Sequence, residues 1–233
     1  MEQKKVKASV IVRAYNSEDT IERTLESALS QDFHLGDYEV ICVNDGSSDG
    51  TQMLIDAYTQ KDLRVRAVHQ ENEGPVKAAN RGFEMSRGEY VTLLDGDDEF
   101  LPYFLSQTVA ILEADPSLDF SYSDYLEEVD GIRKEVPVRH MLETIAGGVV
   151  FRKRSIEAVD FYDESMKFAE YDLLLRTWDA WRKAHVEAAL YVYHRRHTSI
   201  SAQATWVEQA RNELLKKYPE RADDIASMRR YQI

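Results

Sequence analysis

Three carboxylates stand close together at Asp95, Asp97 and Asp98. Such a cluster is repulsive unless solvent or a cation neutralises it, and carboxylate oxygens are the ligands that Mg²⁺ and Mn²⁺ prefer in proteins. Gly96, inside the cluster, lets a ligand approach the backbone closely. The same residues also suit an acidic turn at the start of a helix, where Asp is favoured. Taken alone, the cluster predicts a metal site and a simple turn about equally.

Asp45 begins a second polar segment, which runs to Thr51. Its carboxylate can accept a hydrogen bond from the N–H of a nucleobase, and the amides of the loop and of the following helix can face an anion. The alternative is a turn that ends in a helix cap at Ser48 or Asp49. For this segment in isolation, the turn is the favoured interpretation.

A third polar segment, residues 72–82, has the pattern of a loop followed by a short helix. Asn80 and Arg81 within it either reach a ligand or form a surface pair before a turn. By itself this segment indicates little about function.

Short apolar runs alternate with helical patterns through the first half of the chain. One run directly precedes Asp95, and another precedes Asn44 and Asp45. This alternation predicts an α/β fold with a parallel sheet, helices on both faces and right-handed crossovers. Because ligands bind at the carboxyl ends of such strands, the two acidic segments are expected to share one site. The expected strands are 8–12, 39–43, 65–69 and 90–94, and the expected helices are 21–29, 51–58, 76–85 and 101–114.

The second half of the chain is less regular. Residues 129–145 carry mixed charge and Pro137, which suits a loop over the site. Trp178 and Trp181 lie one helical turn apart and are expected in the core. Strands are expected at 120–125, 148–152 and 189–193, an amphipathic helix at 171–181, and a charged helical tail from Trp206. Three tyrosines either pack in the core or line an acceptor site: Tyr122, Tyr125 and Tyr162.

The chain has 29 basic and 42 acidic residues, for a net charge of −13. This balance disfavours nonspecific binding to nucleic acid or to anionic lipid, although one divalent cation can invert the local field for a nucleotide. Cys42 is the only cysteine, which excludes an intrachain disulfide and a thiolate metal cluster. No apolar run approaches ~20 residues, and the N-terminus lacks the apolar core of a signal peptide. A cytoplasmic location is the simplest interpretation, either free or at the inner face of the membrane.

The polar segments, taken in order, resemble the family 2 glycosyltransferases of the GT-A fold. The first strand and loop of that family match residues 9–17, and two of its late segments match residues 170–176 and 193–201. Several ordered motifs at suitable spacing make a chance resemblance improbable. The central motifs are Asp45-Gly46-Ser47-x-Asp49-x-Thr51, Asn72-x-Gly74, Asn80-x-Gly82 and Leu94-Asp95-x-Asp97-Asp98.

The resemblance implies a Rossmann-like, mostly parallel sheet with helices on both faces, followed by a less regular acceptor-side half. We expect a glycosyltransferase domain at residues 1–204 and a helical tail at residues 205–233. Within the domain, residues 1–115 form the half that binds the nucleotide-sugar, and residues 116–204 form the acceptor-side half.

The resemblance also assigns roles. The family's catalytic base is an acidic residue that corresponds here to Glu170, and its Asp-x-Asp motif, Asp95 and Asp97 here, holds Mn²⁺ or Mg²⁺ and the donor phosphates. Asp45 would contact the nucleobase, and His197 is a candidate metal ligand. The expected nucleotide-sugar contacts are Ala14, Tyr15, Asn16, Asp45, Asn80, Asp95, Gly96, Asp97 and Arg196.

The sequence departs from the family pattern at four places. Asn44 stands where the second-strand motif often has a first aspartate. Arg13 stands where proline is common, and Ala79 stands where arginine is common. Ala169-Glu170 replaces the usual Glu-Asp pair, so a carboxylate survives at the second position only.

The resemblance implies that a sugar moves from a nucleotide-sugar, UDP-linked by family frequency, to an acceptor hydroxyl by a single displacement with inversion. Glu170 would take the proton, and the cation would offset charge on the leaving diphosphate. The expected acceptor is a saccharide or a lipid-linked molecule, as in the synthesis of cell-surface polysaccharides or glycoconjugates.

Two alternatives stay open at this point. The first is a noncatalytic protein that binds nucleotide-sugars, which Ala169 favours. The second is a nucleotidyltransferase, although the chain lacks the basic, glycine-rich phosphate loop of that class near its N-terminus. No nucleic-acid partner is expected, whereas peripheral membrane association and a homodimer are both compatible with the sequence.

Overall fold

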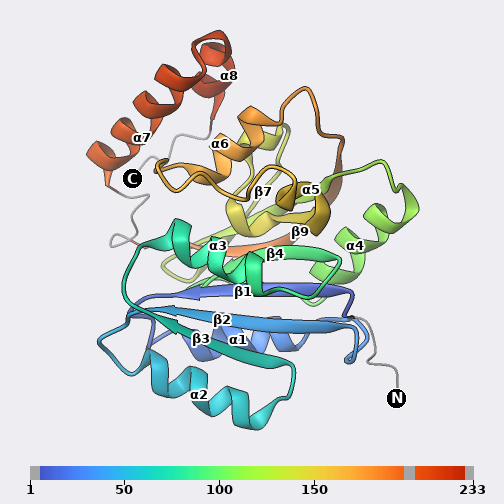
Figure 1. Cartoon of the computed structure of the whole chain (residues 1–233), viewed down its shortest axis with the longest axis vertical. Helices are drawn as coiled ribbons and strands as arrows, with labels where there is room; N and C mark the ends of the chain where they lie inside the picture. Colours follow the sequence, from blue (N-terminus) through green and yellow to red (C-terminus); the bar gives the residue numbers. More distant parts are fainter. Residues whose placement is uncertain (1–5, 197–202, 229–233) are drawn as a thin grey trace.

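The computed structural model of the chain describes residues 6–196 and 203–228, and it is built around one mixed sheet (Figure 1). Within the described residues this sheet has nine strands. The first four strands are parallel and stand in the order β3-β2-β1-β4. Every residue of β2 is buried, as expected for a parallel strand covered on both faces.

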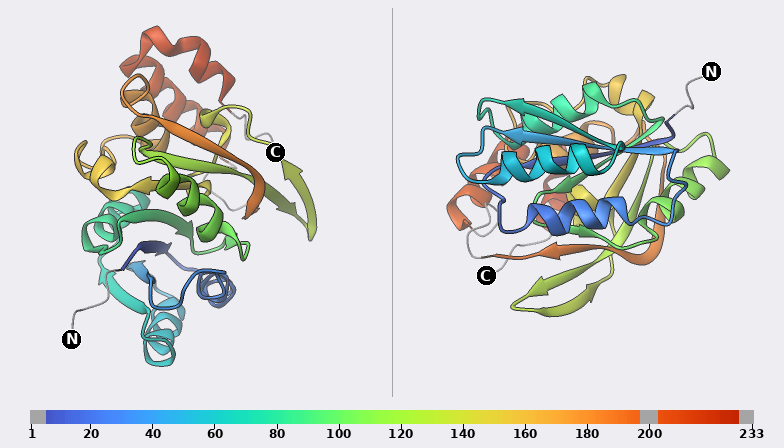
Figure 2. Two further views of the ribbon diagram at one scale, coloured as in Figure 1. Left: turned by 90° about the vertical axis from the view of Figure 1, so that its right-hand side faces the viewer. Right: turned by 90° about the horizontal axis from the view of Figure 1, so that it is seen from below.

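The connections explain where the first helices lie. The chain moves from β1 through β2 to β3 in one direction and then crosses back to β4. Right-handed connections therefore put α1 and α2 on one face of the sheet and α3 on the other (Figure 2). The α/β fold predicted from the sequence is confirmed. The bounds are β1 Ala8–Ala14, α1 Ile21–Leu29, β2 Tyr38–Asp45, α2 Thr51–Lys61, β3 Val65–Gln70, α3 Pro75–Met85 and β4 Tyr90–Asp95.

Beyond β4 the sheet continues through β8, β6, β9 and β5. β8 is antiparallel to both of its neighbours, whereas β6 and β9 are parallel to each other. β6 also forms a hairpin with β7 outside this series. The bounds are β5 Glu99–Phe100, α4 Phe104–Ala114, β6 Phe120–Val129, β7 Ile132–Val136, β8 Val149–Arg152 and β9 Lys183–His194.

Two predictions for the second half were wrong in extent. Residues 129–145 are not one loop, because their first part forms the β6–β7 hairpin. The strand predicted at 189–193 is longer than expected and begins at Lys183. The register between β6 and β9 shifts at Asp124. Such an irregularity breaks the alternation from which a strand is read in the sequence.

The helix predicted across residues 171–181 ends earlier than expected. α6 runs from Ala169 to Arg176, so Trp178 and Trp181 lie beyond its end. Trp181 is half-buried and still packs against the core, with its ring centroid 6.1 Å from those of Phe120 and Phe151. The predicted packing of this tryptophan is therefore confirmed, although not its place on a helix.

The two helices that follow the last strand, α7 and α8, pack onto the rest of the molecule. Ala210, Leu214 and Ile225 are fully buried and belong to the same hydrophobic core as the strands. The division at residue 204 between a domain and a tail stays a prediction. No helix in the described ranges is both long and apolar enough for a membrane span. The bounds are η1 Met141–Glu143, η2 Ala146–Gly148, α5 Lys153–Glu157, α7 Ala204–Lys217, η4 Pro219–Arg221 and α8 Ala222–Ser227.

Candidate active site

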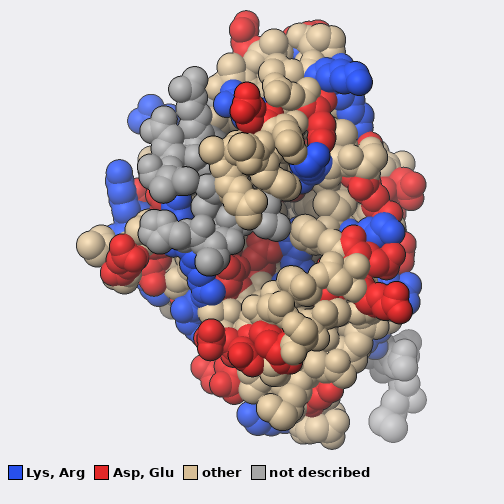
Figure 3. Space-filling view, turned by 90° about the vertical axis from the view of Figure 1, so that its left-hand side faces the viewer, with Lys and Arg blue, Asp and Glu red and all other residues tan. Residues whose placement is uncertain are grey.

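The carboxyl ends of β1, β2 and β4 open into a pocket of about 640 Å³. Figure 3 shows this face of the molecule, where acidic and basic side chains meet inside the hollow. Ligands of open α/β sheets bind at this edge, and the volume suits a small molecule. The second half of the chain supplies the opposite wall, which includes Ile145, Phe168, Glu170 and Trp206.

Asp45, at the end of β2, fixes the loop that follows β3. Its carboxylate accepts hydrogen bonds from Gln70 Nε2 (2.8 Å) and from the backbone N–H groups of Glu73 and Gly74 (2.9 Å each). Gly74 has a φ of 95°, which strongly favours glycine. A carboxylate offers about four lone-pair positions. The three protein donors therefore leave Asp45 with one acceptor position for a ligand.

The loop after β1 forms the neighbouring wall. Asn16 is held on both sides, because its Oδ1 accepts from the Ser48 N–H (2.8 Å) and its own N–H donates to Ser47 Oγ (3.0 Å). Tyr15, by contrast, is 51% exposed. Both residues line the pocket together with Ala14. The polar contacts fix the loop, and they leave the tyrosine ring open to a ligand.

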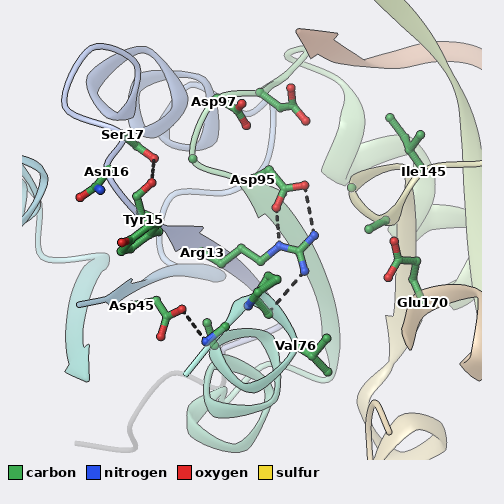
Figure 4. Close-up of a pocket in the computed structure, with 18 of the residues that line it drawn as sticks. Arg13, Tyr15, Asn16, Ser17, Asp45, Val76, Asp95, Asp97, Ile145 and Glu170 are labelled. Carbon is green, nitrogen blue, oxygen red and sulfur yellow. Dashed lines mark hydrogen bonds and ion pairs between the residues drawn. The ribbon is translucent and has the colours of Figure 1, made fainter. Parts of the chain in front are cut away.

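Arg13 lies at the centre of the pocket, where it was not expected (Figure 4). Arg13 and Asp95 are register partners in the parallel ladder of β1 and β4, and the guanidinium donates to both oxygens of the Asp95 carboxylate. It also donates to the carbonyl oxygen of Pro75 (3.4 Å). Burial disfavours the charged guanidinium, but Asp95 and, more weakly, Glu170 outweigh burial and raise the pKa of Arg13. Arg13 is therefore a fixed internal cation.

The signal that could have identified Arg13 was its departure from the family pattern. A charged residue at the end of a buried strand needs a partner. The sequence did not indicate that β1 and β4 are neighbours, so the partner could not be named.

Asp98 has a structural role. It is buried, and its carboxylate accepts hydrogen bonds from the Tyr191 hydroxyl and from the backbone N–H of His194 (2.8 Å). Burial and the neighbouring Asp97 and Asp95 raise the pKa of Asp98 well above its ordinary value. Asp98 therefore ties the acidic loop to β9.

Asp97 is the carboxylate best suited to a divalent cation. It lines the pocket, and burial together with Asp95 raises its pKa, so a cation beside it would relieve an unfavourable charge. Asp95 retains lone pairs beyond the two that Arg13 uses. The described residues contain no preformed group of three His, Cys, Asp or Glu ligands. Because Mg²⁺ is commonly held by one or two carboxylates and substrate phosphates, Asp97 and Asp95 fit such an ion.

Glu170 lies in the first turn of α6 and faces Arg13 and Asp95 across the pocket (Figure 4). Burial raises the pKa of Glu170, and the charge of Arg13 opposes this rise. A carboxylate in such a setting remains ionisable and is a better proton acceptor than an exposed one. The pocket thus has the buried carboxylate of Glu170 on one wall and Asp95, Asp97 and the Arg13 cation on the other.

The pocket brings together most of the residues predicted from the sequence. Those that line it are Ala14, Tyr15, Asn16, Asp45, Asp95, Gly96, Asp97, Glu170 and Arg196. The positive charge of Arg196 lowers the pKa of Asp97, although burial of Asp97 has the larger, opposite effect. His197 lies outside the described residues.

Asn80 requires a correction, because it is not among the residues that line the pocket. Its Nδ2 donates to the carbonyl oxygen of Tyr162 (2.9 Å) and to Glu164 Oε1 (3.2 Å), and its Oδ1 accepts from the Tyr162 N–H (3.0 Å). Both ends of the amide are therefore used to hold the segment before α6 against α3.

The three tyrosines considered for an acceptor site pack in the core instead. Tyr122, Tyr125 and Tyr162 are 8%, 0% and 3% exposed and do not line the pocket. The aromatic residues of the second half that do line it are Phe168, Tyr191, Tyr193 and Trp206. The sequence offered little to distinguish these rings from core residues, because both groups lie in elements with irregular patterns.

The sheet order and the acidic loop after β4 define the GT-A class of fold. The family model for Glycosyl transferase family 2 matches residues 9–162, well over half of the chain, and the chain belongs to this family. The resemblance read from the sequence is confirmed. The match does not support the alternative of a nucleotidyltransferase.

Two curated relatives illustrate the range of the family. The chain is 28% identical over 217 residues to the uncharacterized glycosyltransferase EpsJ of Bacillus subtilis, which covers 83% of this chain and 62% of EpsJ. It is 35% identical over 123 residues to WfaP of Escherichia coli, and this match covers 52% of this chain and 47% of WfaP. WfaP is described as a UDP-Glc:alpha-D-GlcNAc-diphosphoundecaprenol beta-1,3-glucosyltransferase. The chain thus spans less than two thirds of the length of either relative.

Two solved structures share the fold. TarS 1–349 of S. aureus in complex with UDP has a TM-score of 0.70 at 25% identity, and the match covers 90% of this chain and 66% of that one. The mannosyltransferase PcManGT of Pyrobaculum calidifontis, in complex with GDP-Man and Mn²⁺, has a TM-score of 0.73 at 18% identity and covers 91% and 65%. The second likeness concerns the fold alone.

Proposed function

We propose that the chain is the catalytic part of a glycosyltransferase that moves a sugar from a UDP-sugar to an acceptor hydroxyl with inversion at the anomeric carbon. The observation that carries the proposal is the position of Glu170 across the pocket from Asp95 and Asp97 (Figure 4). A single displacement requires a proton acceptor on one side of the sugar and stabilisation of the leaving group on the other. Membership of family 2 supports this assignment.

The base end of the pocket favours uracil over guanine. Uracil presents one N–H between two carbonyl groups, whereas guanine presents two donors on one edge. Asp45 has one acceptor position left after its three protein donors. The exposed ring of Tyr15 offers a surface for stacking. The UDP complex of the related TarS is consistent with this choice.

In the proposed reaction, Glu170 removes the proton of the acceptor hydroxyl while the oxygen attacks the anomeric carbon. The bond from that carbon to the diphosphate oxygen breaks, and its electron pair leaves with UDP. Arg13 holds the Asp95 carboxylate and favours the ionised form of Glu170. A divalent cation, Mn²⁺ or Mg²⁺, held by Asp97 and Asp95 would further stabilise charge on the diphosphate. We propose a saccharide or lipid-linked acceptor, in line with the description of WfaP.

Glu170→Gln tests the proposal, since it preserves the shape of the side chain and removes the base. We expect the UDP-induced rise in melting temperature to be retained and turnover of UDP-sugars with Mn²⁺ to fall about 100-fold or more. Glu187→Gln, an exposed position on β9, is the control and should leave both readouts unchanged.

The second candidate function, noncatalytic binding of a nucleotide-sugar, is favoured by Ala169 in the family's acidic pair. If the wild type and Glu170→Gln both bind UDP-sugars and neither consumes any of them, binding without catalysis replaces our proposal. Transfer by the wild type that Glu170→Gln leaves undiminished would instead remove Glu170 from its role.

A further inference from the structure

One wall of the pocket comes from α7, the helix that follows the sheet. Trp206, in its first turn, is half-buried and lines the pocket. Its ring stands edge-on to that of Phe168, with centroids 5.2 Å apart and an interplanar angle of 85°. Phe168 is the N-cap residue of α6 and lines the pocket as well. Trp206 therefore lies on the same wall as Glu170.

The other two tryptophans are used for packing. Trp178 has the Arg221 guanidinium 4.7 Å from its ring centroid, and Trp181 lies against Phe120 and Phe151. Neither of them lines the pocket. The tryptophan of α7 is thus the indole that a ligand in this pocket would contact.

Charged contacts hold α7 in place. Asp172 has no exposed surface and lies on α6 just beyond Glu170. Its nearer charge partner is Lys217 on α7, and Arg176 on α6 lies 3.5 Å from its other oxygen; a buried carboxylate is costly when such partners are removed. The hydroxyl of Tyr218 also donates to it, at 2.8 Å. The ion pairs between α7 and the rest of the molecule are Lys217 with Asp172 (2.7 Å), Lys217 with Asp163 (2.7 Å) and Glu213 with Lys167 (2.5 Å).

A half-buried indole that lines a pocket together with a carboxylate suits a saccharide. The C–H face of a pyranose ring packs on an aromatic face, and the hydroxyls at its rim bond to neighbouring polar groups. The nucleobase and diphosphate of the donor have their own contacts at Asp45 and Asp97, on the opposite wall. Glu170, on α6, and Lys167, just before it, are polar residues that line the same pocket as Trp206.

We propose that Trp206 is the platform on which the terminal sugar ring of the acceptor stacks, so that the acceptor is a saccharide and its attacking hydroxyl is presented to Glu170. This inference rests on the proposed function, and it assigns α7 to the acceptor site. An acceptor hydroxyl on a simple lipid or on a side chain of a protein would not use this platform.

The direct test follows the indole N–H signals of protein labelled with ¹⁵N-tryptophan. Trp206→Phe removes one signal and so assigns it. We expect octyl β-glycosides of glucose, galactose or N-acetylglucosamine, added to protein saturated with UDP, to shift the Trp206 signal, and 1-octanol to leave it in place. The platform is refuted if none of the glycosides moves this signal, or if 1-octanol moves it as strongly. A shift produced by UDP-glucose alone would assign Trp206 to the donor and would also refute the proposal.

Kinetics supply the second readout. Trp206→Ala should raise the KM for the octyl glycoside about tenfold or more and leave the affinity for UDP unchanged within about twofold. The KM of Trp206→Phe should lie between those of the wild type and Trp206→Ala. An unchanged acceptor KM in Trp206→Ala overturns the inference. A wild type that shows the signal shift and no turnover would refute the proposed transferase and leave the saccharide platform intact, so the two failures are distinguishable.

Discussion

Replacement of Arg13 by methionine should destabilise the protein and strengthen its binding of Mn²⁺. The guanidinium and the Asp95 carboxylate form two hydrogen bonds, and their side chains are 15% and 32% exposed. Breaking a fully buried pair costs about 3–5 kcal/mol, and a hydrogen bond to a charged group contributes about 1.5–3 kcal/mol. Because Asp95 keeps about a third of its exposure, we expect a loss near the lower end, about 2 kcal/mol.

For a chain of this size, about 2 kcal/mol corresponds to a melting temperature lower by about 4–8 °C. The variant should also respond more strongly to Mn²⁺, because the freed Asp95 stands next to Asp97 and offers a second carboxylate. A tenfold gain in affinity adds up to about 1.4 kcal/mol of stabilisation at saturating metal. In one melting experiment, Arg13→Met should therefore have a lower melting temperature without MnCl₂ and a larger rise in melting temperature when MnCl₂ is added.

Arg81→Met is the matched control. Arg81 lies on α3 in an exposed ion pair with Glu84, where the side chains are 55% and 53% exposed, and such a pair contributes about 0–1 kcal/mol. If Arg13→Met melts within about 1 °C of the wild type and Mn²⁺ shifts both proteins equally, the assignment of Arg13 as the internal cation that restrains Asp95 is wrong.

Two further predictions concern pH and the docking of α7. Burial raises the pKa of Glu170 above the ordinary 4.5 and only the ionised form accepts a proton, so kcat/KM should rise with pH through a midpoint above 4.5. Arg13→Met should move the midpoint upward, because Arg13 favours the ionised carboxylate; a pH–rate profile with an unmoved midpoint would contradict this. Lys217→Met should lower the free energy of unfolding by about 2 kcal/mol, because the fully buried Asp172 loses the nearer of its two charge partners and keeps Arg176. Lys216→Met, at the neighbouring exposed position, should change it by less than about 0.5 kcal/mol. Urea titrations that find equal effects for both lysines would count against the docking role.

The first half of the fold was predictable because β1, β2 and β4 are buried along nearly their whole length. Continuous apolar runs separated by helical patterns have few competing interpretations, and the polar residues that follow them mark the ligand edge of the sheet. Asp45, Asp95 and Asp97 were found in this way. Their roles came from the resemblance to a family, since an acidic loop alone does not distinguish a metal site from a turn.

The rest of the site depends on contacts between residues that are distant in sequence. Arg13 meets Asp95 because β1 and β4 are adjacent, although two strands separate them along the chain. Asn80 is used by the Tyr162 segment, which no local pattern indicates. Trp206 reaches the pocket because ion pairs fold α7 back onto α6. Charge and periodicity in a sequence do not specify such pairings.

The buried contact of Asp98 with β9 also limits which acceptor-side halves of other family members could replace the one in this enzyme. The Tyr191 ring lies against Gly147, where a Cβ atom would stand 2.0 Å from the ring, so the position has room for glycine only. The contact thus depends on three residues from both halves of the chain: Asp98, Tyr191 and Gly147. A chimera that took its acceptor half from another family member would need to bring a matching tyrosine and glycine. Without them the buried Asp98 would lose its hydroxyl donor and keep only the backbone N–H of His194, which would weaken the attachment of the loop that carries Asp97.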